Sequence, residues 1–335
     1  MNKSLPSIII DLFILFLFGF VISVLTFGDS LMPNIMLSDS FLHMNTIFLS
    51  ILIEALPFVL IGVLIAGFIQ IFITEDQLKR WIPKNKYLAV LMSCVVGGLF
   101  PACECGIVPI VRRLIAKGVP IYAGVGFLLT GPLINPIVIF STYMAFGNDL
   151  QIALSRMFLG FLIALVIALL VSFLFRSNQL KHSIMNENQC SLHAPHTYKQ
   201  SFLDKLGKTT LHAVDEFFDM GKYLIIGALL ASFVQVYVST EFLVSVGNGH
   251  AAALAIMMGL AYLLSLCSEA DAFIGASFSN IFPQTAILGF LIYGPMIDLK
   301  NTLMMLSVFK IRFVVVFVVL VSVTTFILLS LLQGL

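Results

Sequence analysis

Charged residues are scarce in this sequence, and their scarcity excludes a water-soluble fold. Lys, Arg, Asp and Glu make up 10% of the 335 residues and hydrophobic residues 60%, whereas soluble domains carry about 25% charged residues. The formal net charge is only +1, and the basic residues lie in short clusters between apolar runs, so we expect no nucleic-acid partner. The expected surroundings of the chain are a lipid bilayer.

Motifs for nucleotide hydrolysis and for a disulfide framework are also missing. The sequence has no G-x-x-x-x-G-K-S/T phosphate-binding loop and no polar segment long enough for a nucleotide-hydrolysing domain, so any energy coupling is expected to be ionic. The five cysteines do not form the framework of a secreted protein. We therefore expect free thiols, no cofactor and no enzymatic activity.

Long apolar runs are what the sequence does contain. A helix of about 20 apolar residues crosses the hydrocarbon core of a bilayer, which is about 30 Å thick. These runs predict an all-α polytopic integral membrane protein, with an extra helix at the N-terminus. Such runs occupy residues 7–27, 47–73, 152–175, 222–238 and 313–332.

The basic residues between the runs predict the orientation, because loops rich in Lys and Arg stay in the cytoplasm. Four segments carry basic clusters and are expected inside: residues 79–86, 112–117, 176–208 and 300–312. Four others lack Lys and Arg and are expected outside: residues 28–45, 147–150, 239–249 and 277–284. We expect a multi-pass protein of the inner (plasma) membrane, with a cytoplasmic N-terminus and the C-terminus outside.

Two basic residues, Arg156 and Lys300, lie in or near apolar segments. Arg156 lies near the outer end of its predicted helix, and we expect it to snorkel to the surface or to pair with Asp149. Lys300 is assigned to the fourth inner cluster, together with Lys310 and Arg312.

Residues 87–114 begin and end on the basic side and are therefore predicted to form a hairpin. Each arm has about 14 residues, or about 20 Å of helix, which is short for a full crossing. The segment between the arms is Pro-Ala-Cys-Glu-Cys-Gly at residues 101–106. Because proline removes a backbone hydrogen bond and glycine permits positive φ, we expect two short helices meeting at a break.

The two halves of the chain resemble each other. IGVLIAGFIQ at residues 61–70 aligns with IGALLASFVQ at 226–235, and GFLLTGPLIN at 126–135 aligns with GFLIYGPMID at 289–298; each pair has six identities in ten positions. The offset changes only from 165 to 163. We expect four parts: residues 1–45 with the N-terminal helix and outer loop, 46–176 with the first repeat, 177–210 as cytoplasmic linker and 211–335 with the second repeat.

By the distribution of charge, the two repeats cross the membrane in opposite directions. Inverted repeats with broken helices are typical of secondary transporters, whose sites lie at the repeat interface near the midplane. Charged side chains at this depth are costly, so each one is a functional candidate. The offsets pair Glu54 with Asp219, Glu104 with Glu269, and Asn135 with Asp298.

The cysteines suit a second kind of chemistry. Cys103 and Cys105 would diverge by about 200° on an unbroken helix, but a break lets both sulfurs share one side. With Cys267 from the other repeat they would surround a thiophilic centre, such as trivalent arsenic or a soft metal. The alternative is that the cysteines simply pack a tight hairpin.

Further candidates lie around the breaks and in the linker. The two Gly-Pro segments, residues 131–136 and 294–298, are expected to break their helices and to expose backbone groups to a substrate. Asp271 follows Glu269 in the second repeat's equivalent of the Cys-x-Cys segment. Cys190, His193 and His196 have metal-ligand spacing, although a polar linker of this kind is typically disordered.

The segment FPACECGIVP at residues 100–109, together with residues 126–136, resembles the predicted bacterial permease family that includes the organoarsenical efflux permeases. The resemblance spans nearly the whole chain, and the acidic segment 267–271 also fits it. It implies a two-repeat permease and, for the characterised branch, export of trivalent organoarsenicals. It does not fix the cargo of this chain.

The predicted function is a secondary permease that exports a small thiophilic solute such as a trivalent organoarsenical or a soft metal species. Its substrate-binding candidates are Cys103, Glu104, Cys105, Asn135, Cys267, Glu269, Asp271 and Asp298, with Glu54, Glu104, Asp219 and Glu269 for proton or ion coupling. Two alternatives stay open. One is a membrane thiol redox protein that cycles Cys103 and Cys105, and the other is a metal-handling subunit that works with a metal-binding partner protein.

Overall fold

The computed structural model describes residues 39–100, 103–175, 177, 179–181, 202–237, 249–264 and 266–332. The predicted N-terminal span at residues 7–27 lies outside the described residues, as do Cys190, His193 and His196 of the linker. Within the described ranges every named element is a helix, and five helices are long and apolar enough to cross a membrane. The prediction of an all-α polytopic membrane protein is confirmed.

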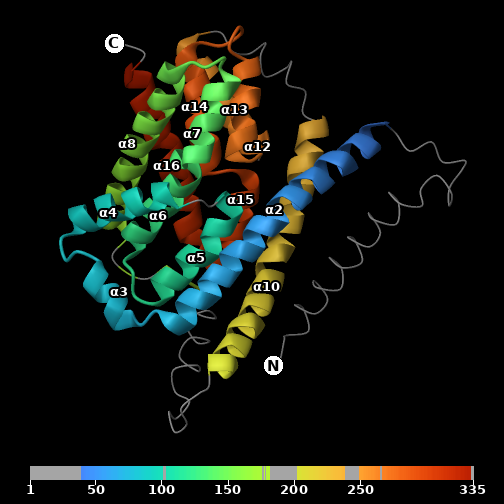
Figure 1. Cartoon of the computed structure of the whole chain (residues 1–335). Coiled ribbons are helices and arrows are strands. Elements are labelled where there is room, and N and C mark those ends of the chain that lie inside the picture. Colours follow the sequence, from blue (N-terminus) through green and yellow to red (C-terminus); the bar gives the residue numbers. More distant parts are fainter. Residues whose placement is uncertain are drawn as a thin grey trace, which may run out of the picture.

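Two long helices lie side by side along one flank of the molecule. They are α2 (Asp39–Phe72) and α10 (Phe202–Tyr237), and they run in opposite directions (Figure 1). Each is the first described helix of one sequence repeat. Their antiparallel packing is what two repeats of opposite orientation require.

The helices that follow occur in the same order in both halves. After α2 and the short α3 (Glu75–Trp81), the first half has α4 (Lys86–Leu99), α5 (Glu104–Ala116), α6 (Ile121–Ile134), α7 (Pro136–Ala145) and α8 (Leu150–Leu174). After α10, the second half has α12 (His250–Leu264), α13 (Ser268–Ser277), α14 (Gln284–Met296), α15 (Leu299–Val308) and α16 (Ile311–Leu332). Apart from α3, the described helices of each half are thus a long helix, two pairs of short helices and a final span.

The breaks between the short helices lie in or beside the predicted segments. In the Gly-Pro segments the prolines remain inside helices, Pro132 in α6 and Pro295 in α14, and the chain breaks two or three residues later. The reason is capping of the next helix. Asn135 accepts a hydrogen bond from the Ile137 amide at 3.0 Å, and Asp298 accepts one from the Asn301 amide.

A close approach of backbones holds α5 against α2. A Cβ atom added at Gly62 would lie 2.2 Å from the carbonyl oxygen of Gly106, and one added at Gly106 would lie 2.7 Å from the carbonyl oxygen of Phe58. Only glycine leaves room for such a contact. It places the first turn of α5, which carries the Cys-x-Cys segment, beside the middle of α2.

A buried ion cluster joins the halves at the other end of α5. The Arg113 guanidinium lies 2.8 Å from Glu216 Oε2 of α10, and the Arg112 guanidinium lies 3.3 Å from Glu216 Oε1. All three side chains are buried. Arg112 and Arg113, which served above as markers of an inner loop, are thus helical residues packed against the second repeat.

Candidate functional site

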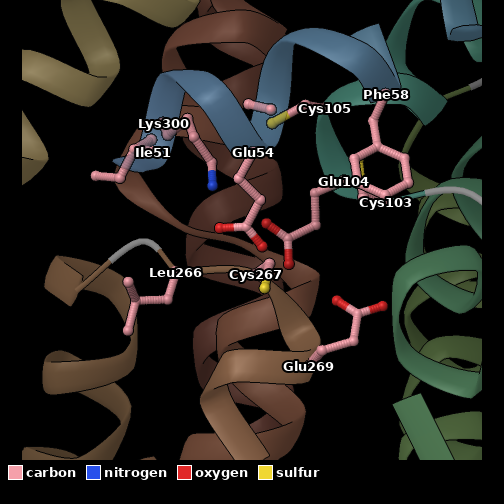
Figure 2. A pocket seen from close by; sticks show the side chains of 11 residues that line it. Ile51, Glu54, Phe58, Cys103, Glu104, Cys105, Leu266, Cys267, Glu269 and Lys300 are labelled. Atoms are coloured by element: carbon pink, nitrogen blue, oxygen red, sulfur yellow. The ribbon is translucent and has the colours of Figure 1, made fainter. Parts of the chain in front are cut away.

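A pocket lies where the first turns of α5 and α13 approach each other beside α2 and α15 (Figure 2). Its free volume is about 20 Å³, which is room for about one water molecule. Both repeats contribute to its walls. The lining residues are Ile51, Glu54, Ala55, Phe58, Cys103, Glu104, Cys105, Leu266, Cys267, Glu269 and Lys300.

The break before α5 brings two thiols together. Cys103 is the N-cap residue and has extended backbone geometry, with φ −77° and ψ 170°, whereas Cys105 already lies in the helix. Because of this change in geometry, the two thiols are in hydrogen-bond contact instead of pointing apart. A pair of thiols from the first repeat therefore lines one side of the pocket.

The second repeat contributes Cys267 at the equivalent break. Cys267 is the N-cap residue of α13, and its sulfur accepts a hydrogen bond from the Ala270 amide at 3.4 Å. Its thiol also contacts the Glu54 carboxylate, which comes from the middle of the predicted span Ser40–Gln70 in α2. Thiols from both halves thus line the same pocket.

Glu104 lies deepest among the carboxylates of the pocket. It is 3% exposed, and its Oε1 accepts a hydrogen bond from the Ser268 hydroxyl at 3.1 Å. Its Oε2 is buried and has no hydrogen-bond partner among the described residues. In Figure 2 the Glu104 and Glu54 carboxylates point toward each other, and Glu269 projects from the α13 side. The pocket therefore offers acceptor oxygens from three helices.

Two helix N-termini face this pocket. The aligned peptide dipoles give the N-terminus of a helix a partial positive charge, which favours carboxylates in its first turn. Glu104 begins α5, and Glu269 lies in the first turn of α13. The broken helices thus help to hold negative charge at a depth where it would otherwise be costly.

Lys300 lines the pocket, although its place in a basic cluster predicted an inner loop. The structure corrects this assignment, because Lys300 lies in the first turn of α15 and is 4% exposed. Its ammonium lies 3.4 Å from Asp298 Oδ2. The positive-inside rule considers only how close a lysine lies to an apolar run in the sequence. It therefore does not show that Lys300, at the break between α14 and α15, is buried inside the protein.

Arg156 corrects a second expectation. It neither snorkels nor pairs with Asp149, which instead caps α8 by accepting hydrogen bonds from the Gln151 and Ile152 amides. Arg156 is fully buried and donates to Thr142 Oγ1 at 2.6 Å and to the Ser268 carbonyl at 3.2 Å. The first repeat thereby supplies a cation to the second repeat's break.

The remaining predicted residues lie outside the pocket lining. Asp298 pairs with Lys300, which lines the pocket. Asp271 is buried, and its carboxylate faces Gly294. Asn135 is occupied as the cap of α7. Asp219 is half exposed and pairs with Lys222 at 2.9 Å, so it does not join Glu54. The roles proposed for these residues stay predictions.

The metal-ligand hypothesis also stays a prediction. Among the described residues, no group of three or more His, Cys, Asp or Glu side chains is arranged to hold a metal ion. Cys103, Cys105 and Cys267 share the pocket in this conformation without forming a coordination site.

The fold and the buried polar pocket define a multi-pass membrane protein whose duplicated halves enclose a small site. The chain belongs to the predicted permease family ArsP_1, whose model matches residues 40–334. No solved structure matches the chain.

Two bacterial relatives cover most of the chain. The UPF0718 protein YcgR of Bacillus subtilis (strain 168) is 51% identical over 276 residues, which is 82% of this chain and 92% of that protein. A protein of Streptococcus mutans, named a putative two-component membrane permease complex subunit, is 44% identical over 282 residues, 84% of this chain and 92% of that protein. The name of the second relative is that of a membrane permease subunit.

Proposed function

We propose that this chain is a secondary permease that exports a small thiophilic solute, such as a trivalent organoarsenical or a soft metal species. The observation that carries the proposal is the convergence of Cys103 and Cys105 from one repeat and Cys267 from the other on a single pocket. Sulfur ligands favour soft centres over magnesium or calcium. A cargo bound there contacts both halves of the protein.

The shape of the pocket supports transport by alternating access. In this conformation the pocket has room for about one water molecule, so an organoarsenical does not fit unless the surrounding helices move. Inverted repeats move against each other around a site at their interface. A relative movement of α5 and α13 would open the pocket and separate its thiols and carboxylates.

The carboxylates supply the ionic coupling in this proposal. Glu104 has a buried oxygen without a hydrogen-bond partner among the described residues, and Glu54 points toward it from α2. Glu269 lines the pocket from the second repeat. A carboxylate as buried as that of Glu104 is stabilised by a proton or a nearby cation, so we expect release of the cargo to be coupled to uptake of positive charge at the pocket.

Accumulation in sensitive cells tests the proposal. Cells that express the wild-type chain are expected to accumulate less methylarsenite or cadmium than cells that express the Cys103→Ser/Cys105→Ser variant. Cys94→Ser is a matched control, because Cys94 is buried in α4 and does not line the pocket. Equal accumulation with wild-type and double-variant protein for every thiophilic cargo would refute thiol-dependent export.

A second candidate function is that of a metal-handling subunit in a two-component complex. The printed name of the Streptococcus mutans relative, 44% identical to this chain, supports the two-component part of this candidate, and the pocket thiols support the metal part. Purified chain in proteoliposomes decides between the candidates. Transport by the chain alone would show that no partner is required, whereas transport only after a metal-binding partner is added would establish the two-component function.

A further inference from the structure

Lys300 occupies a position in its helix and in the protein interior that disfavours a positive charge. It is the second residue of α15, and the N-terminal turn of a helix repels positive charge. It also lies within a membrane protein and is 4% exposed, so its ammonium has lost most of its hydration. Only nearby negative charge offsets both costs.

The negative charge comes from both sides of the pocket. The Lys300 ammonium lies 3.4 Å from Asp298 Oδ2, and Lys300 lines the same pocket as the Glu104 carboxylate. Figure 2 shows the ammonium pointing into the pocket on the side of the Glu54 carboxylate. The second repeat thus holds a positive charge against the thiol and carboxylate groups of the first repeat.

The packing behind Lys300 keeps it in this place. A Cβ atom added at Gly227 of α10 would lie 3.0 Å from Lys300 Cα and 3.4 Å from its Cβ. The absence of a side chain at Gly227 therefore lets α15 approach α10 and places the lysine stem against it. The stem of the side chain lies against α10, and the ammonium lies at its far end.

The pocket has room for about one water molecule, and the Lys300 ammonium lines it beside the thiols and carboxylates, so a cationic cargo competes with the ammonium for the same groups. Displacement alone would leave Asp298 and Glu104 without their counter-ion, and uncompensated buried charge is strongly unfavourable. A neutral cargo would leave these carboxylates without a counter-ion, whereas a cationic cargo supplies one.

We propose that Lys300 is a tethered counter-cation that fills the empty pocket, and that the cargo is a thiophilic cation which exchanges with it. The inference rests on the proposed function and narrows its substrate class from thiophilic solutes to thiophilic cations such as Cd²⁺. The cation binds the thiols and carboxylates while the ammonium withdraws. When the cation leaves, the ammonium returns and offsets part of the negative charge of the empty site.

Cd²⁺ binding to the purified full chain in detergent tests the exchange. A tethered ammonium competes at high effective concentration, so Lys300→Met is expected to bind Cd²⁺ at least about tenfold more tightly than wild type. Lys300→Arg keeps the positive charge and should show no such gain. Lys310→Met is the matched control, because it removes a lysine of the same repeat that does not line the pocket.

The variant should also transport more slowly, because no internal cation replaces the departing cargo. If Lys300→Met does not fold, Lys300→Gln retains a hydrogen-bond donor for Asp298 and carries the same expectation. Unchanged or weaker Cd²⁺ binding by a folded variant without the Lys300 charge would overturn the inference.

The Cys103→Ser/Cys105→Ser variant in the same assay separates two kinds of failure. Binding that depends on the thiols but not on Lys300 would refute only the exchange. Binding that depends on neither would refute the proposed site itself.

Discussion

In the first half of the chain, α5 begins after Cys103 with Glu104 and Cys105, whereas in the second half α13 begins after Cys267 with Ser268 and Glu269. The two breaks have the same backbone design, an N-cap cysteine followed by an acidic first turn. Their side chains differ, because the first half supplies two thiols in contact and the second supplies one thiol and a hydroxyl. The duplicated scaffold therefore carries an unequal set of donors.

Each half also supplies a buried cation to the other half. Lys300 of the second half faces the thiols and Glu104 of the first, whereas Arg156 of the first half binds the Ser268 carbonyl of the second. Ser268 in turn donates to Glu104. Each break therefore has a cation from the other half beside it.

The largest expected effect concerns the thiols. Cys103→Ser/Cys105→Ser removes two of the three pocket sulfurs and is expected to reduce thiophilic-cargo transport at least about tenfold, or about 1.4 kcal/mol of binding or barrier energy. Cys267→Ser removes one and should cost less. Initial rates in membrane vesicles at equal protein levels measure both. A greater loss with Cys267→Ser would reverse the assignment of the first half as the main sulfur donor.

The next effect concerns stability. Arg156→Met leaves Thr142, the Ser268 carbonyl and nearby carboxylates without their buried cation, and removal of one partner from a buried ionic group costs about 3–5 kcal/mol. Ser268→Ala removes a single hydrogen bond to Glu104 and should cost about 1.5–3 kcal/mol. Thermal unfolding in detergent measures the difference. If Arg156→Met were as stable as wild type, Arg156 would not tie the halves together.

Substitution of a glycine in either long helix is expected to have a smaller effect on stability, and the effect should differ between the two helices. Gly62→Ala places a Cβ 2.2 Å from a backbone oxygen of α5, and overpacking of this kind typically costs about 1–3 kcal/mol. Gly227→Ala meets Lys300 Cα at 3.0 Å, so a slight shift of α15 relieves it at lower cost. The two midpoints of thermal unfolding are the readout. Equal midpoints would show that α5 and α15 are held equally tightly.

The smallest effect is expected where the repeat pairs a residue that lines the pocket with one that does not. Glu54→Gln removes a carboxylate from the pocket and should lower the transport rate, whereas Asp219→Asn alters an exposed pair with Lys222 and should leave it nearly unchanged. Vesicle transport at matched expression distinguishes them. A comparable loss with both variants would mean that Asp219 reaches the transport path in another conformation.

Much of the fold could be predicted from the sequence because the relevant signals are local. Apolar length predicts spans, and the alignment of 61–70 with 226–235 predicts two equivalent halves. The Gly-Pro segments marked the second pair of breaks, but their position depends on capping by Asn135 and Asp298. Proline in the last turn of α6 or α14 is tolerated, so it did not locate the break to the residue.

The site was predictable where its chemistry is unusual for a membrane span. Cys103, Glu104, Cys105 and Glu269 stand out in apolar sequence, and their convergence follows from the repeat. Lys300 and Arg156 were missed because neither has a charged counterpart in the other repeat and both lie close to loops in sequence. Their burial depends on contacts between halves, such as that of Gly227 with Lys300, which no local pattern reveals.

Protection of cysteines from alkylation tests most directly whether one pocket shared by both repeats binds the cargo. Membranes with the wild-type protein are treated with a maleimide, with and without methylarsenite or Cd²⁺, and the modified peptides are quantified by mass spectrometry. The account predicts that a transported cargo slows alkylation of Cys103 and Cys267 together, and that Cys103→Ser/Cys105→Ser weakens the protection of Cys267. Undiminished alkylation of both residues under saturating, transported cargo would contradict it.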